Sequence, residues 1–240
     1  GNDYGEPVME YKKPNVGDVK WEICEPAASD DFTDTELGLQ WQWNANPKKE
    51  WYALTGTNLR LNAIKKNSVY GDMPNLLLQK WCAPEFTCVT KLDLSNLADG
   101  DEAGVISMGM TYGLVTFKKN GNTLAASYVT GVQKYGKIVP DETIETVTEL
   151  APIDAANAGE VFVKYTVKRT GLRDLNANEK DFPLEIVTIE YSTDGNDYQK
   201  AGDMTAIPGR WVGVKNGVFC ASEKDGSTGY AVVDSVIYQA

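Results

Sequence analysis

Hydrophobic and polar residues alternate with a period of two in many short stretches of this chain. The alternation is clear in GLQWQWN (38–44), NLRLNAI (58–64), FTCVTKLDL (86–94) and KYTVKR (164–169). A period of two is typical of β-strands that bury one face and expose the other. In the first stretch we therefore expect Leu39, Trp41 and Trp43 to share one face.

Turn signals separate these stretches, and helical periodicity is almost absent. Asp194-Gly195 lies between two alternating stretches, which predicts a tight hairpin turn. Many short strands at this spacing predict an all-β fold, an antiparallel two-sheet β-sandwich, as one domain over residues 29–240. Residues 1–28 carry prolines and glycines without any period and are interpreted as an entry segment, the tail of something longer. The turn signals are DGDEAG (99–104), KNGN (119–122), STDGND (192–197), KNG (215–217) and EKDGSTG (223–229).

Residues 131–160 interrupt this rhythm of turns. They include DETIETVTEL, with Glu142, Glu145 and Glu149. We interpret the segment either as a strand pair with a solvated acidic face or as an insertion.

Composition and charge exclude several function classes. The chain has 240 residues and a formal net charge of −11, which argues against a nucleic-acid or an anionic membrane partner. Its apolar runs are much shorter than the roughly 20 residues that span a bilayer. Because there is no histidine, a Ser-His-Asp triad, a Cys-His dyad and a histidine-ligated zinc are all excluded.

The four cysteines form no Cys-x-x-Cys pair, so a four-cysteine zinc site is not expected. Cys82 and Cys88 are close enough in sequence to bridge a short loop. The alternative, which we favour, is that the cysteines are free thiols buried in the fold.

Six tryptophans and twelve tyrosines in an acidic all-β chain suggest sugar recognition, because sugar C–H faces stack on aromatic rings. The candidates are Trp41, Trp43, Trp51, Trp81 and Trp211. The alternative is that a sandwich of this size buries most of its tryptophans. Trp41 and Trp43 lie in phase on one predicted strand and favour the core, whereas for Trp51 and Trp81 the two interpretations stay open.

Paired carboxylates that would suit a glycosidase are not found. EIVTIE at 185–190 resembles the motif of sandwich glucanases, but Val187 stands where that motif has its central acid. Glu185 and Glu190 are also five residues apart, which places them on opposite faces of a strand. Glu145 and Glu149 share a face, and a solvated surface explains them better.

A structural calcium is the one cofactor that we expect. Asp234 interrupts an apolar strand, YAVVDSVIY, and a carboxylate there needs a partner. The first and last strands of sandwiches often pair, which would bring Asp234 near Asp30 and Asp31. We predict a cation at Asp31 and Asp234. The alternative is a hydrogen-bonded strand aspartate.

Several segments of the chain resemble the C-terminal sandwich domain of glycoside hydrolase family 43 β-xylosidases and α-L-arabinofuranosidases. The most specific string is LGLQWQWN at 37–44. The resemblance covers roughly three quarters of residues 29–240, and residues 131–185 match poorly. The matching segments are 29–54, 75–94, 99–108, 112–121, 189–202 and 217–238.

This resemblance implies a concanavalin A-like jelly roll that accompanies a five-bladed catalytic propeller on its N-terminal side. Residues 1–28 would then be the linker that leaves the propeller. The family's catalytic carboxylates lie in the propeller, so none transfers to this chain. In relatives the sandwich packs on the propeller, and one of its loops can help to close the substrate pocket.

We therefore expect an accessory domain of a xylosidase or arabinosidase that acts on hemicellulose, inactive by itself. The expected partners are the catalytic propeller and an oligo- or polysaccharide. The rival interpretations are an independent carbohydrate-binding module for xylan and, less favoured, a free-standing sandwich hydrolase. The expected compartment is the periplasm or the outside of the cell. Because residue 1 is Gly rather than Met, we expect that the chain begins at a processing or cloning junction and that any targeting signal of a precursor has been removed.

Two loops carry the candidate contacts to the substrate pocket, QKWCAPEFT (79–87) and MGMTYG (108–113). Large apolar groups at strand ends are costly to expose unless something covers them. The alternative for Phe86 and Tyr112 is that both turn back into the core. The candidates are Trp81, Phe86, Met110 and Tyr112, with Trp51 as a further carbohydrate contact.

Overall fold

The computed structural model describes residues 10–15, 17, 27–135, 140–154, 159–171, 185–209 and 211–240. Side chains are described throughout these ranges except at 133–135 and 140–141. Most of the predicted linker, residues 1–28, lies outside them. Within the described ranges no helix is long and apolar enough to cross a membrane.

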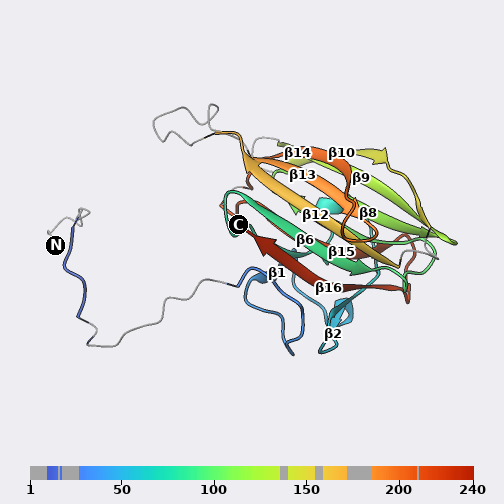
Figure 1. Ribbon diagram of the computed structural model, residues 1–240, viewed down its shortest axis with the longest axis horizontal. Coiled ribbons are helices and arrows are strands. Elements are labelled where there is room, and N and C mark those ends of the chain that lie inside the picture. The colour runs from blue at the N-terminus through green and yellow to red at the C-terminus, as the bar shows by residue number, and fades with distance from the viewer. Residues whose placement is uncertain are drawn as a thin grey trace.

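Nearly all of the regular structure in the described residues is β-strand, arranged in two sheets (Figure 1). The first sheet has seven antiparallel strands in the order β14-β13-β12-β6-β16-β3-β2. These strands are β2 (Tyr52–Leu54), β3 (Leu59–Asn62), β6 (Phe86–Asp93), β12 (Glu160–Arg169), β13 (Glu185–Ser192), β14 (Gln199–Ala206) and β16 (Tyr230–Gln239).

The second sheet has nine strands, with a main path in the order β1-β5-β15-β7-β8-β9-β10. Strand β11 pairs with β9, and the short β4 runs parallel to β15. The strands are β1 (Trp41–Trp43), β4 (Ile64–Lys65), β5 (Leu77–Lys80), β7 (Asp101–Met108), β8 (Thr111–Asn120), β9 (Thr123–Tyr135), β10 (Pro140–Glu149), β11 (Ile153–Asp154) and β15 (Lys215–Ser222). Two single-turn 3₁₀-helices, η1 (Lys49–Trp51) and η2 (Tyr70–Asp72), lie in the connections.

The main hydrophobic core lies between the two sheets, and strands β13 and β14 pack on β8. Alternating positions build this core. In β6, for example, Phe86, Cys88, Thr90 and Leu92 are buried, and the residues between them are partly exposed. The prediction of an antiparallel two-sheet β-sandwich is therefore confirmed.

A second, smaller core covers the outer face of the nine-stranded sheet. Here Tyr70 and Met73, in and beside η2, pack with sheet residues that include Tyr112, Leu114 and Phe219. The sheet is thus buried on both faces in its middle. This explains why β7, β8 and β15 are buried almost continuously rather than at every second residue.

Two local predictions were wrong. Leu39 does not share a face with Trp41; it lies in a turn, closed by a bond from the Trp41 N–H to the Gly38 carbonyl, and it is fully exposed. Residues 215–217 are not a turn but the start of β15. A Cβ on Gly217 would lie 2.2 Å from the Leu77 carbonyl oxygen, so the glycine admits a neighbouring strand rather than a turn.

The segment 131–160 contains a strand pair, as one of the two interpretations predicted. Strand β10 pairs with β9 from Pro140 to Glu149 and forms an edge of the nine-stranded sheet. Its face is only partly a solvated acidic surface. Glu142 and Glu149 are exposed, whereas Glu145 is half-buried and hydrogen-bonded.

Candidate functional site

The two loops that were predicted to contact the substrate lie beside a third loop, and backbone bonds connect the three. The N–H of Met110 donates to the Ile207 carbonyl at 2.7 Å, and the N–H of Trp81 donates to the Val214 carbonyl at 3.2 Å. One end of the sandwich therefore gathers these loops. They are 79–87, 108–113 and 207–214.

Trp81 keeps part of its surface open, whereas Phe86 is in the core. The Trp81 Nε1–H donates to Asn216 Oδ1 at 2.9 Å, and its ring meets the Phe86 ring edge-on at 5.5 Å. Phe86 is 4% exposed and also packs on Tyr238 at 5.4 Å. Phe86 thus supports Trp81 from behind, which is the alternative that the sequence left open, and Trp81 is the better placed of the two for a contact.

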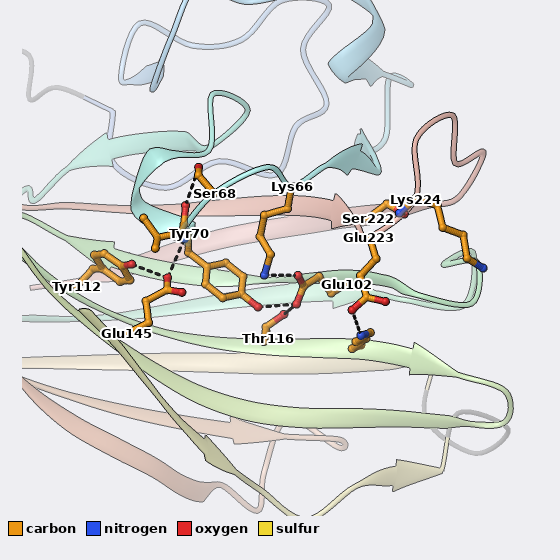
Figure 2. Close-up of polar contacts among 12 residues, drawn as sticks. Lys66, Ser68, Tyr70, Glu102, Tyr112, Thr116, Glu145, Ser222, Glu223 and Lys224 are labelled. Carbon is orange, nitrogen blue, oxygen red and sulfur yellow. Dashed lines mark hydrogen bonds and ion pairs between the residues drawn. The ribbon is translucent and has the colours of Figure 1, made fainter. Parts of the chain in front are cut away.

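Tyr112 also turns into the fold and is 1% exposed. A Cβ on Gly131 would lie 2.0 Å from the Tyr112 ring, and one on Gly71 would lie 2.8 Å from it. The ring therefore fits between two glycines, one in the sheet and one in η2. Its hydroxyl donates to Glu145 Oε1 at 2.5 Å (Figure 2).

A network of hydrogen bonds joins this tyrosine to a buried acid (Figure 2). The N–H of Tyr70 also donates to Glu145 Oε1, at 2.8 Å, and the Tyr70 hydroxyl donates to Glu102 Oε2 at 2.6 Å. Thr116 donates to the same Glu102 oxygen, and Lys66 pairs with the other at 2.8 Å. These bonds join Tyr70 of η2 to side chains of the sheet, so the network anchors η2 on the sheet.

The electrostatics of this network hold both tyrosines in the protonated form. Burial, and then the neighbouring Glu102 carboxylate, raises the pKa of Tyr70 well above its ordinary value. Burial, and then the hydrogen bond to Glu145, raises the pKa of Tyr112. Neither tyrosine is placed to exchange a proton near neutral pH.

The other two sequence candidates are Trp51 and Met110. Trp51 is buried in η1, and its ring meets the Trp43 ring at 5.5 Å. Trp43 is partly buried against the main core. Met110 is half-buried in its loop. Sugar contacts by Trp51 and Met110 stay predictions.

A cleft of about 750 Å³ opens beside β1, β5 and the end of β16. Asp30 holds two of its lining side chains in place. Its Oδ2 accepts hydrogen bonds from Trp41 Nε1 at 2.7 Å and from Gln40 Nε2 at 3.1 Å. Aromatic rings and amide side chains both line this cleft, a combination that is typical of ligand pockets. The lining includes Gln40, Trp41, Gln79, Lys80, Trp81 and Tyr238.

Trp211, one of the five candidate tryptophans, is the most exposed aromatic side chain of this end. Its side chain is 97% exposed, and its backbone has φ 63°, a left-handed conformation that is costly for a bulky residue. Backbone bonds between Gly209 and Gly213 close the loop below it. Position in the sequence does not distinguish Trp211 from a core tryptophan; only its exposure does.

Two lysines meet at the base of this loop. Lys80 and Lys215 are Cα partners on β5 and β15, so their side chains leave the same face of the sheet. Burial, and then the charge of Lys80, lowers the pKa of Lys215 below its ordinary value.

The acids of the predicted cation site have protein partners. Asp234 Oδ2 lies 3.1 Å from Lys91 Nζ, and Asp31 Oδ1 accepts a 2.8 Å bond from the Thr33 hydroxyl. Among the described residues no group of three or more His, Cys, Asp or Glu could hold a metal ion. The cation at Asp31 and Asp234 stays a prediction, and Lys91 offers an alternative source of positive charge.

The two carboxylates that were considered for glycoside hydrolysis, Glu185 and Glu190, both form ion pairs with basic side chains. Arg169 Nε lies 3.0 Å from Glu185 Oε1, and Lys164 Nζ lies 2.9 Å from Glu190 Oε2. Both glutamates are on β13 at positions of opposite parity, which agrees with opposite faces. They cannot flank one substrate.

Three cysteines are described, and all are free thiols. Cys88 and Cys220 are buried, and Cys82 is exposed. Burial raises the pKa of Cys88 to about 12. The interpretation of the cysteines as buried free thiols is therefore confirmed for Cys88 and Cys220. No disulfide joins Cys82 to Cys88.

Comparison with curated proteins finds relatives much longer than this chain. The chain is 29% identical over 248 residues to a β-xylosidase of Formosa agariphila, which covers 98% of this chain and 38% of that protein. It is 23% identical over 229 residues to a non-reducing end α-L-arabinofuranosidase of Bacteroides ovatus, which covers 93% of this chain and 39% of that protein. The chain therefore spans about two fifths of the length of these relatives.

A solved structure of a GH43 glycoside hydrolase, engineered to display both endo-xylanase and exo-arabinofuranosidase activity, superposes with a TM-score of 0.73 at 20% identity. The match covers 93% of this chain and 42% of that chain, and at this identity it shows the fold alone. The family model of the β-xylosidase C-terminal concanavalin A-like domain matches residues 29–239. This chain belongs to that family, the C-terminal accessory domain of GH43 xylosidases and arabinofuranosidases.

Proposed function

We propose that this domain packs on the N-terminal catalytic domain of a longer xylosidase or arabinofuranosidase and forms part of the wall of its substrate pocket. The proposed substrate is hemicellulose of the xylan or arabinoxylan type. Family membership and the greater length of the relatives support this proposal. So does the pairing of Glu185 and Glu190 with basic residues, which makes these two glutamates unsuitable as a catalytic pair.

The observation that carries the proposal is the exposure of Trp211. Tryptophan is among the residues most enriched in protein interfaces. A fully exposed indole on a strained backbone contributes little to the stability of this chain by itself. Ile207 and Val212 of the same loop are also exposed. A second protein surface would cover this apolar tip, and the catalytic domain is the surface that the family supplies.

Other exposed apolar side chains compete for this role. Val132, Ile144 and Val147 are exposed on β9 and β10, at an edge of the nine-stranded sheet; Val132 and Ile144 share one face, and Val147 lies on the other. They come from a regular, paired part of the sheet and carry no backbone strain at these positions. They provide the matched control rather than the favoured contact.

The test compares Trp211→Ala with Val147→Ala in the isolated chain and in the longer enzyme. We expect neither change to shift the melting temperature of the isolated chain by more than about 2 °C, since both side chains face solvent. In the longer enzyme, Trp211→Ala should raise KM or lower kcat severalfold, and Val147→Ala should leave both unchanged.

Trp81→Ala serves as a second variant at the same end, and we expect it to act in the same direction. Unchanged kinetics for Trp211→Ala and Trp81→Ala would leave the domain without a part in the pocket. Impairment by Val147→Ala alone would assign the docking surface to the β9–β10 edge instead. Tyr112→Ala is not suitable here, because Tyr112 is buried and its loss would disturb the fold.

An independent carbohydrate-binding module is the second candidate, and the cleft with Trp41, Trp81 and Tyr238 is the observation that favours it. Trp41 and Tyr238 are buried, however, so Trp81 alone presents an open ring surface there. Affinity electrophoresis of the isolated chain in an arabinoxylan without uronic acid branches separates the candidates. A binding module would be retarded in the gel, and a domain that only packs on its enzyme would not.

A further inference from the structure

Lys80 and Lys215 stand directly opposite each other on neighbouring strands. Paired residues on one face of a sheet have Cβ atoms about 5 Å apart, and like charges at that spacing are destabilising. A protein retains such a pair at a cost in stability. The position therefore calls for a negatively charged group.

No ion pair involving Lys80 or Lys215 is found among the described residues, although the chain has a net charge of −11. Lys215 is half-buried, so water screens its charge only in part. Four other partly buried lysines do have carboxylate partners, whereas Lys119, which is also partly buried, has no ion pair among the described residues. These pairs are Lys66 with Glu102, Lys91 with Glu160 and Asp234, Lys118 with Glu223, and Lys164 with Glu190.

We propose that Lys80 and Lys215 form a carboxylate-binding site and that its ligand is an acidic sugar, a uronic acid unit carried by a hemicellulose chain. Two ammonium groups on one face would hold one carboxylate by charge-assisted hydrogen bonds. The choice of a hemicellulose sugar rests on the proposed function. The lysine site itself rests on the pairing of the strands and on the missing counter-charge.

The neighbouring cleft supports a sugar rather than a bare carboxylate. Lys80 and Trp81 both line it, together with the amides of Gln40 and Gln42. The half-buried indole offers a surface on which a sugar ring stacks, and amides hydrogen-bond to hydroxyl groups. A carboxylate from the catalytic domain would use the lysines alone and would leave these groups without a role.

The site also lies next to the loop that we propose faces the substrate pocket. Lys215 follows Val214 directly, and Val214 accepts the backbone bond from Trp81. An acidic substituent held here would extend from a chain that the catalytic domain engages. In that arrangement this domain would favour substrates that carry acidic branches.

The test measures binding to the isolated chain by titration calorimetry at low salt. The ligands are a xylo-oligosaccharide that carries one glucuronic acid, the neutral xylo-oligosaccharide of the same length, and acetate. We expect the acidic oligosaccharide to bind about tenfold more tightly than the neutral one, since one charge-assisted contact is worth about that factor. The difference should shrink as salt is added.

The variants Lys80→Met and Lys215→Met should each abolish the preference for the acidic ligand. Lys164→Met, at a lysine that already has Glu190 as partner, is the matched control and should keep the preference. Equal affinity for the acidic and neutral ligands, or a preference that survives both variants, would overturn the site. Acetate that binds as tightly as the acidic oligosaccharide would overturn the sugar assignment.

These outcomes are separate from those of the proposed function. The binding assay uses only this chain, whereas docking on the catalytic domain is tested through Trp211 in the longer enzyme. Loss of the sugar preference would leave the docking proposal standing, and the reverse also holds.

Discussion

The hydroxyl of Tyr112 on β8 reaches across β9 to donate a 2.5 Å hydrogen bond to Glu145 on β10. The residue between them in the register is Gly131, and the tyrosine ring lies where a Cβ of that residue would be. Gly71 of η2 approaches the same ring from the loop that covers the sheet. The contact thus joins three strands and a loop through one side chain.

Gly131→Ala should destabilise the chain, because the added methyl group would collide with the Tyr112 ring at 2.0 Å. We expect a loss of about 1–3 kcal/mol in the free energy of unfolding, the usual cost of overpacking. Gly159→Ala is the control, since its nearest neighbours would be at 3.4 Å, and it should cost less than about 0.5 kcal/mol. Urea denaturation measures both, and equal stability of the two variants would contradict the ring position.

Tyr70→Phe should lower the free energy of unfolding by about 1–3 kcal/mol, because it removes the 2.6 Å bond to the buried Glu102. Tyr191→Phe is the control; its hydroxyl bonds to Gln199 at 3.3 Å, between neutral groups, and its loss should cost less. Thermal unfolding at pH 7 compares them. A larger effect of Tyr191→Phe would count against the anchoring network.

Stability should fall steeply with pH above about 10, the ordinary pKa of tyrosine. The pKa values of Tyr70 and Tyr112 are raised in the folded chain. Their contribution is therefore fully present below about pH 10 and is lost as the pH rises, because only the unfolded chain ionises them there. Each such tyrosine adds up to about 1.4 kcal/mol per pH unit to the fall.

The variants Tyr70→Phe and Tyr112→Phe should therefore show a shallower loss of stability than the parent chain between pH 9 and pH 11. Urea unfolding at several pH values in this range gives the slope. Identical slopes in the parent and both variants would show that neither tyrosine has a raised pKa in the folded chain.

Lys215→Met should stabilise the chain at pH 7. The pKa of Lys215 is lowered in the folded state, so the charged form that exists at pH 7 costs stability, and removing it relieves that cost. We expect a rise of about 1–3 °C in melting temperature. Lys80→Met should have much the same effect, and the double variant should gain less than the sum of the two because they share one repulsion. A lower melting temperature for Lys215→Met would contradict the repulsion.

The isolated chain should not hydrolyse aryl xylosides or arabinofuranosides. Glu185 and Glu190 are held in ion pairs on opposite faces of β13, and Glu145 is held by Tyr112 and the Tyr70 N–H. A chromogenic assay at high protein concentration checks this. Turnover that disappears on changing one glutamate of this chain would contradict the accessory role.

The sequence by itself determined the class of fold, because alternation is a local property. The pattern of 86–94 is one in which every second residue faces the core, and the structure has Phe86, Cys88 and Leu92 there. The Asp194-Gly195 turn follows from the same kind of information, since glycine adopts the positive φ of 75° found at Gly195. Trp41 was expected in the core and lies there.

Only the tertiary structure decided which distant residues meet and which face of a residue stays open. Local patterns do not report that Tyr112 lies over Gly131, or that Lys80 and Lys215, 135 positions apart, become partners. Residues 215–217 pair with β5 on one side and β7 on the other, which is why Lys215-Asn216-Gly217 is a strand where a turn was expected. Trp211 differs from the buried tryptophans in its neighbours rather than in its sequence. Strand pairing and burial arise from contacts between remote segments, and these contacts assemble the end of the sandwich where we place the function.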